Sequence, residues 1–166
     1  MLVTAVVFWV NHLTIKVRVI VKLFYIIFSE WTYQDLSRDQ KPSQSDEMAR
    51  IIENNGRVEP YFDENGEPLG PLRVWLKYED IPGLAMSRSF GDQLAASVGT
   101  TSEPEIFEYN FESDDKFLIV ASDGIWEFIS SSDSISIIKD YYLINDPKSC
   151  CEFLLKEAST RWIQEE

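Results

Sequence analysis

The first hydrophobic pattern along the chain has a period of two and predicts β-strands. Residues 14–22 alternate polar and β-branched side chains, which is typical of a half-buried strand. Residues 72–76 are consistent with a short strand, and residues 116–121 form a short apolar run that predicts a fully buried one. Just before residues 72–76, the sequence Asp-Glu-Asn-Gly at 63–66 is a turn signal that predicts the tip of a hairpin.

A second pattern has helical spacing. Residues 45–53 begin with a capping serine and early acids, and they place Met48, Ile51 and Ile52 on one predicted apolar face.

Two more helices are predicted near the end of the chain. One spans residues 132–142, with Ser132 or Asp133 as its cap, and another starts at Pro147. The pattern therefore predicts a mixed fold of strands and helices.

Composition narrows the class of partner. The chain has 166 residues, enough for one domain with a core, and a formal net charge of −13. This balance argues against nucleic acid as a partner, because binding phosphate backbones requires a surplus of cations. The cysteines, Cys150 and Cys151, are adjacent and form neither a disulfide framework nor a zinc motif. We therefore expect packed thiols in an intracellular compartment, cytoplasmic or nuclear.

The first 30 residues differ from the rest. Residues 1–30 contain three basic residues and one acidic residue, a net charge of +2, so residues 31–166 carry a net charge of −15. A spanning helix needs about 20 mostly apolar residues, but Lys16, Arg18 and Lys22 interrupt every such window. We favour one or two sheet strands here. A membrane-associated segment and sequence foreign to the fold are the alternatives.

The most informative local feature is the end of the predicted buried strand, where Ser122, Asp123 and Gly124 form a turn signal. A buried strand is a rigid mount, and a carboxylate at its end can face a cleft. Mg²⁺ and Mn²⁺ prefer oxygen ligands of this kind. The structural alternative is an aspartate that caps the next turn through its own backbone.

A second feature lies at residues 83–92. Arg88 and Asp92 are four residues apart and can pair, and the flanking glycines permit a tight turn. Alone, this segment is equally typical of a buried structural loop.

Several segments in this order resemble the metal-dependent protein serine/threonine phosphatases of the PPM type, also called type 2C. The resemblance extends from about Trp31 to Trp162 and corresponds to the second half of the catalytic domain. The matching segments are LSRDQKPS (36–43), DEMARI (46–51), NGRV (55–58), LAMSRSFGD (84–92), EPEI (103–106) and FLIVASDGIWE (117–127).

The resemblance implies an α+β fold, a partial α/β sandwich of antiparallel sheets flanked by helices. It also implies hydrolysis of phosphoserine and phosphothreonine in phosphoprotein substrates with Mg²⁺ or Mn²⁺. By motif match, Asp123 is a metal ligand followed by Gly124, Asp92 is a structural acid near the site, and Arg88 holds its loop. Residues 41–74 correspond to a flap that borders the cleft.

The sequence also departs from the family. The Asp-Gly-His-Gly motif is missing, the only histidine is His12, and no residue matches the phosphate-gripping arginine. Asp123 is the only metal-ligating acid that can be assigned, and no catalytic residue can be. We therefore expect an incomplete phosphatase, such as a fragment or an incorrect gene model, that is inactive as this isolated chain. The alternatives are a degenerate phosphatase that binds phosphoproteins as a regulatory module, and an interaction protein tethered to a membrane by residues 1–30.

Overall fold

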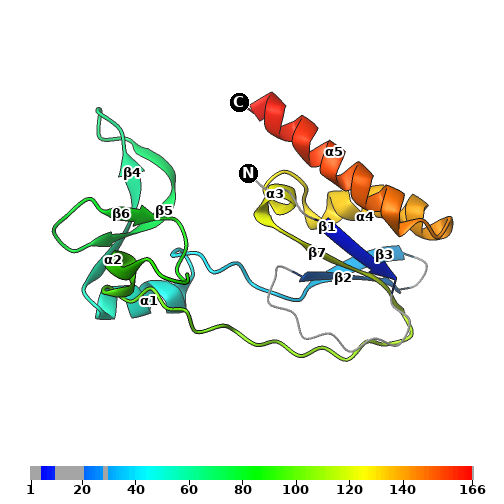
Figure 1. Ribbon diagram of the computed structural model, residues 1–166, viewed down its shortest axis with the longest axis horizontal. Helices are drawn as coiled ribbons and strands as arrows, with labels where there is room; N and C mark the ends of the chain where they lie inside the picture. Colours follow the sequence, from blue (N-terminus) through cyan, green and yellow to red (C-terminus); the bar gives the residue numbers. More distant parts are fainter. Residues whose placement is uncertain (1–4, 10–20, 28–29, 166) are drawn as a thin grey trace. The chain divides into compact units, whose positions relative to one another are not determined.

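The structure is a computed structural model of the 166-residue chain, and it describes residues 5–9, 21–27 and 30–165. The chain divides into two compact units, which are described separately (Figure 1). The first unit comprises residues 1–38 and 106–166, and the second comprises residues 39–105. Most of the strand predicted at residues 14–22 lies outside the described residues. The boundary at residue 30 stays a prediction.

The first unit contains a four-stranded antiparallel sheet with the order β1-β7-β2-β3. Its strands are β1 (Ala5–Trp9), β2 (Val21–Ile27), β3 (Glu30–Asp35) and β7 (Asp115–Ala121). β7 is the apolar run predicted from the sequence, and it pairs with a neighbour on each side. Both faces of β7 are apolar because both are covered: Phe117, Ile119 and Ala121 belong to one buried cluster, and Leu118 belongs to another with Leu36.

Helices cover one face of this sheet. They are α3 (Asp123–Trp126), α4 (Ser131–Leu143) and α5 (Pro147–Glu165). α4 and α5 confirm the two helices predicted near the end of the chain. The predicted cap of α4 is wrong, however, because Ser130 caps it and accepts a hydrogen bond from the backbone N–H of Asp133.

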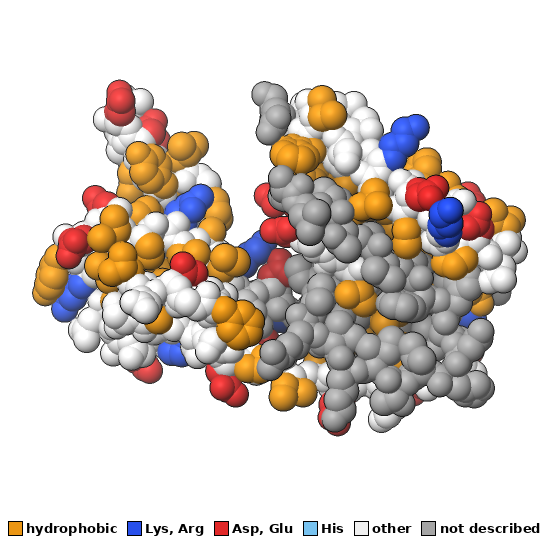
Figure 2. Space-filling view, viewed as in Figure 1, with side chains coloured by type: hydrophobic (Ala, Val, Ile, Leu, Met, Phe, Trp, Pro, Cys, Tyr) orange, Lys and Arg blue, Asp and Glu red, His pale blue; other side chains and the backbone are white. Residues whose placement is uncertain are grey.

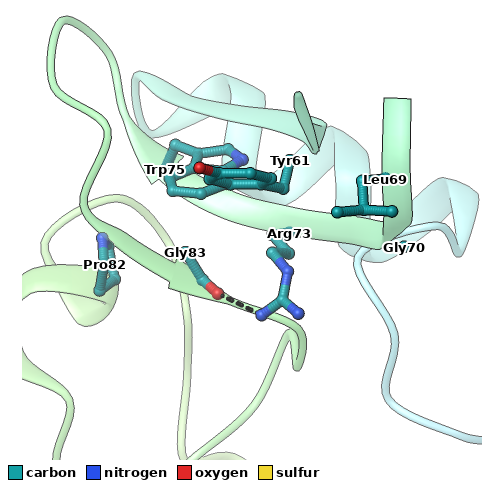
Figure 3. A pocket seen from close by; sticks show the side chains of 7 residues that line it. All are labelled: Tyr61, Leu69, Gly70, Arg73, Trp75, Pro82 and Gly83. Carbon is teal, nitrogen blue, oxygen red and sulfur yellow. Dashed lines mark hydrogen bonds between the residues drawn. The ribbon is translucent and has the colours of Figure 1, made fainter. Parts of the chain in front are cut away.

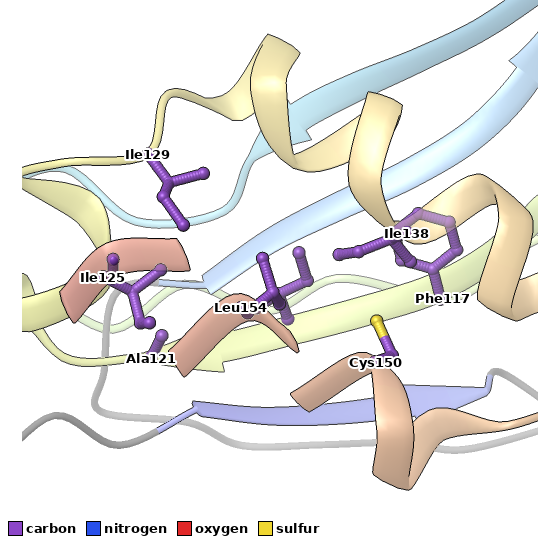
Figure 4. Close-up of a cluster of buried hydrophobic side chains, with 9 residues drawn as sticks. Phe117, Ala121, Ile125, Ile129, Ile138, Cys150 and Leu154 are labelled. Carbon is purple, nitrogen blue, oxygen red and sulfur yellow. The ribbon is translucent and has the colours of Figure 1, made fainter. Parts of the chain in front are cut away.

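The core of the first unit lies between the sheet and these helices (Figure 4). Phe117, Ile119 and Ala121 alternate along β7 and point toward the helices, as the period of a strand requires. Cys150 on α5 joins this core, and burial raises the pKa of its thiol to about 12. Both cysteines are free thiols, as predicted.

The second unit packs helices on a three-stranded antiparallel sheet with the order β4-β5-β6. The predicted hairpin tip is confirmed, because Asp63 Oδ1 accepts hydrogen bonds from the N–H groups of Asn65 and Glu67. The elements of this unit are α1 (Ser45–Glu53), β4 (Gly56–Phe62), β5 (Pro68–Leu76), β6 (Pro82–Leu84) and α2 (Gln93–Ala96).

The core of the second unit is small. Ile51 of α1, Val74 of β5 and Val98 are buried together. The apolar face predicted for α1 is partly wrong, because the Ile52 side chain is 56% exposed while Glu47 is fully buried. Glu47 lies four residues before Ile51 and therefore shares its inward face.

The architecture confirms the predicted α+β class with antiparallel sheets and flanking helices. The two sheets belong to different units, so their face-to-face packing stays a prediction. None of the helices in the described part of the chain is both long and apolar enough to cross a membrane.

Candidate functional site

Asp123 lies at the exit of the buried central strand. β7 ends at Ala121, Ser122 continues in extended backbone, and Asp123 begins the short helix α3 where a turn was predicted. The carboxylate is exposed to solvent. Asp123 Oδ1 accepts a hydrogen bond of 2.8 Å from the N–H of Gly124, as the capping alternative predicts. This bond leaves Oδ2 available for another interaction.

The backbone around Asp123 is held on both sides. The indole Nε1 of Trp126 donates to the carbonyl of Ala121 at 3.0 Å, and the N–H of Glu127 donates to the carbonyl of Asp123 at 2.8 Å. Gly124 and Ile125 are buried beneath this turn. The carboxylate of Asp123 therefore projects from a fixed position, although its side chain is in water.

The described residues do not form a complete metal site. No group of three or more His, Cys, Asp or Glu side chains that could hold an ion occurs among them. Residues 1–29 contain no Asp or Glu at all. One carboxylate supplies too few oxygens for the near-octahedral coordination that Mg²⁺ requires. We therefore derive no catalytic step through a metal ion for this chain.

Arg88, predicted to hold its own loop, belongs to a charged cluster in the second unit. Its Nη2 lies 2.6 Å from Oε1 of Glu47, and its Nη1 donates to the carbonyl of Glu103 at 2.9 Å. Arg50 holds the same glutamate through two hydrogen bonds, of 2.6 Å and 2.8 Å. We call Glu47, Arg50 and Arg88 the Glu47 cluster.

Glu47 is the member of this cluster that lies deepest. Its side chain is fully buried, while Arg50 and Arg88 are 28% and 17% exposed. Burial alone would raise the pKa of Glu47, but the hydrogen bonds from Arg50 and Arg88 outweigh it and hold the pKa well below its usual range. Glu47 therefore stays ionised and ties α1 to the loop of Arg88.

Asp92 belongs to the second unit, whereas Asp123 belongs to the first. Asp92 precedes α2, with a left-handed φ of 44° and an exposed side chain. Its carbonyl accepts a hydrogen bond from the N–H of Ala96. The role of Asp92 as a structural acid near the site, and that of Asp123 as a ligand, stay predictions, since these residues belong to different units.

Sequence reasoning missed the part that Glu47 plays. Arg88 and Glu47 are 41 residues apart, so no local pattern pairs them. One signal was available, because a glutamate four residues before Ile51 lies on the inward face of a predicted helix and needs a cation there.

Comparison with known proteins defines the class of this chain. The sequence model described as Protein phosphatase 2C matches residues 19–165. A rice relative, "Probable protein phosphatase 2C 64" (Oryza sativa subsp. japonica), is 38% identical over 126 residues, which are 76% of this chain and 28% of the relative. An Arabidopsis thaliana relative, "Probable protein phosphatase 2C 61", is 41% identical over 62% of this chain and 30% of its own length.

Solved structures agree with this fold. The serine-threonine phosphatase 2C from Toxoplasma gondii aligns with a TM-score of 0.67 at 21% identity, over 86% of this chain and 47% of that one. A structure described as a C. elegans sex determining protein aligns with a TM-score of 0.64 at 22% identity, over 86% of this chain and 31% of that one.

The fold and the sequence matches together define a protein phosphatase catalytic domain, of which this chain contains a part. The chain belongs to the protein phosphatase 2C family. It spans less than a third of the length of the two curated relatives named above. The family match begins at residue 19, inside the first 30 residues.

Proposed function

We propose that this chain contributes part of a catalytic domain that hydrolyses phosphoserine and phosphothreonine in phosphoprotein substrates with Mg²⁺ or Mn²⁺. The family membership supports the reaction class. The observation that supports a role of this chain in the reaction is Asp123, an exposed carboxylate just after a rigid buried strand, whose Oδ2 accepts no hydrogen bond from a described residue.

In this proposal Asp123 is one ligand of the metal centre, which the described residues do not complete. Gly124 contributes its backbone N–H, which orients the carboxylate through Oδ1 and leaves Oδ2 for the ion. Arg88 and Asp92 act in the second unit as structural residues, Arg88 by holding Glu47. The named curated relatives are phosphatases, which favours this proposal over a module that only binds phosphoproteins.

The proposal predicts that the isolated chain has no phosphatase activity. The purified 166-residue chain is assayed with p-nitrophenyl phosphate and with a phosphothreonine peptide, with Mn²⁺ or Mg²⁺ and with EDTA. We expect no metal-dependent turnover, because one carboxylate cannot hold two bridged ions. A full-length plant relative assayed in parallel is the positive control. Clear metal-dependent turnover by the chain itself would contradict the proposal.

The role of Asp123 is tested separately by metal binding. Mn²⁺ is paramagnetic, so an ion held at Asp123 broadens the amide NMR signal of Gly124 even when it binds weakly. We expect this broadening in the wild-type chain and its loss in Asp123→Asn. The matched control is Asp140→Asn, which removes an exposed carboxylate from α4 and should leave the broadening unchanged. Broadening that survives Asp123→Asn would exclude this carboxylate as the ligand.

A further inference from the structure

A hollow of about 280 Å³ lies on the sheet of the second unit (Figure 3). Its walls include the side chains of Tyr61, Leu69, Arg73 and Trp75. Val74 lies between the last two and points into the core, so Arg73 and Trp75 belong to the opposite face of β5. The hollow therefore lies on the side of the sheet that does not pack against α1.

Arg73 brings an unpaired cation to this hollow. Its Nη1 donates to the carbonyl of Gly83 at 2.8 Å, and no other described residue accepts a hydrogen bond from it. The Nε and Nη2 atoms of Arg73 are not buried, so water reaches them. Glu59 lies opposite Arg73 in the sheet register, but its carboxylate binds Arg57 at 3.0 Å. The Nε–Nη2 edge is therefore free to hold a carboxylate through two parallel hydrogen bonds.

Apolar surface lies beside this cation. The side chains of Tyr61 and Leu69, which are cross-strand partners, are 53% and 60% exposed. The Trp75 ring is 8% exposed, and its Nε1 already donates to the carbonyl of Glu59. Gly83 keeps the ring in place, since a Cβ there would lie 2.8 Å from it. The hollow thus combines the guanidinium of Arg73 with largely apolar walls, in which the indole N–H of Trp75 already has its hydrogen-bond partner.

We propose that this hollow docks a segment of a partner protein that carries an Asp or Glu beside an apolar side chain. The carboxylate binds the Nε–Nη2 edge of Arg73, and the apolar side chain packs on Tyr61 and Leu69. This docking uses neither Asp123 nor a metal ion, and it therefore goes beyond the proposed hydrolytic function.

The charge of the second unit favours a carboxylate over a phosphate. Residues 39–105 contain 13 acidic and six basic residues. Figure 2 shows acidic side chains at the tip of the β4–β5 hairpin and apolar side chains over the sheet below it. A phosphate dianion meets more repulsion in this field than a carboxylate with a single charge. Arg73 supplies the local attraction for one negative charge only.

The proposal is tested by NMR titration of the ¹⁵N-labelled chain in buffer with EDTA. The probe is the blocked peptide acetyl-Leu-Asp-Leu-amide, compared with the Asn and the phosphoserine versions of the same peptide. We expect a saturable shift of the Trp75 indole and Arg73 Nε signals with the Asp peptide. The Asn peptide should bind roughly tenfold more weakly, because it loses a charge-assisted pair. Equal binding of the Asp and Asn peptides, or tighter binding of the phosphoserine peptide, would overturn the proposal.

Variants locate the binding. Arg73→Gln should remove the preference for Asp over Asn, while Lys77→Gln removes an exposed cation just after β5 and should not change it. Leu69→Ser changes an exposed side chain and should weaken both peptides without removing the preference. If Arg73→Gln disturbs the sheet because its hydrogen bond to Gly83 is lost, Leu69→Ser still tests whether the peptide binds in this hollow. Binding that is unchanged in both Arg73→Gln and Leu69→Ser would place the peptide elsewhere. EDTA makes this result independent of the metal and turnover experiments.

Discussion

The two units of this chain are stabilised by different kinds of interaction. In the first, nine of the residues whose burial is described form one buried cluster between β7 and its helices. The second has a smaller packed cluster of Ile51, Val74 and Val98, together with the Glu47 cluster, in which a fully buried carboxylate binds two arginines. Apolar burial does not depend on ionisation, whereas an ion pair does. The units should therefore respond differently to truncation and to acid.

The largest effect is expected from removing the aromatic ring at the centre of the first core. Phe117 is fully buried and its ring lies 5.7 Å from that of Trp31. Phe117→Ala should lower the free energy of unfolding by about 3–5 kcal/mol, because it leaves a cavity. Hydrogen exchange measured segment by segment should show lost protection in α4 and α5. Ile163→Ala is the control, since that side chain is 75% exposed and should change stability by less than about 0.5 kcal/mol.

A somewhat smaller effect is expected from breaking the Glu47 cluster. Glu47→Gln removes the negative charge and leaves two partly buried guanidinium groups without it. Removing one partner of a buried pair costs about 3–5 kcal/mol, and we expect the lower end because Arg88 also contacts Glu105. The measurement is hydrogen exchange of α1 and β5. Protection equal to wild type would show that the cluster contributes no net stability.

Acid sharpens this comparison. The pKa of Glu47 is held below its ordinary value of 4.5, so the unfolded chain binds the proton more readily than the folded one. The stability that the cluster contributes is complete above that ordinary value and is lost as the pH falls below it. The second unit should therefore lose protection from about pH 5 downward, and Glu47→Gln should flatten this dependence. A profile as steep in Glu47→Gln as in wild type would contradict the assignment.

The smallest effect concerns the start of α4. Ser130→Ala removes the side-chain oxygen that accepts from the N–H of Asp133 and should cost about 1 kcal/mol. Ser132→Ala is the matched control, because Ser132 is one of the two caps expected from the sequence, yet its hydroxyl contacts the hydroxyl of Ser130 and caps no backbone N–H of the described helix. In thermal unfolding, Ser130→Ala should have a lower Tm than Ser132→Ala. The reverse order would restore the original assignment of the cap.

Sequence patterns over a few neighbouring residues predicted the helices and strands that those same residues determine. The bounds of α1 agree with its predicted range, although the predicted serine cap is wrong, because Gln44 occupies the N-cap position and no side chain caps the helix there. The helix ends at Glu53, two residues before Asn55, whose φ is 63°. β7 was predictable because its residues are buried on both faces of the sheet and therefore form a continuous apolar run. By contrast, β6 is three residues long and depends on pairing with β5. Its sequence holds Pro and Gly, which do not favour a strand.

The parts of the candidate site that depend on adjacent residues were predictable, and the parts that depend on distant residues were not. Asp123 could be placed at the end of a buried strand because both the strand and its turn are written in adjacent residues. The partner of Arg88 could not be predicted from the sequence. Asp92, four residues away, was the candidate partner, whereas the fold pairs Arg88 with Glu47 on α1. The hollow at Arg73 depends on the register of β4 and β5, which sequence patterns do not specify around a bulge.

The division of the chain has an evolutionary consequence. Residues 39–105 are one uninterrupted stretch inserted between β3 and β7, and both of these strands hydrogen-bond to β2. Substitutions, insertions or deletions inside that stretch leave the ladders of the four-stranded sheet in place. Sequence changes within residues 39–105, including those at the hollow beside Arg73, can therefore accumulate while β7 and the position of Asp123 stay the same.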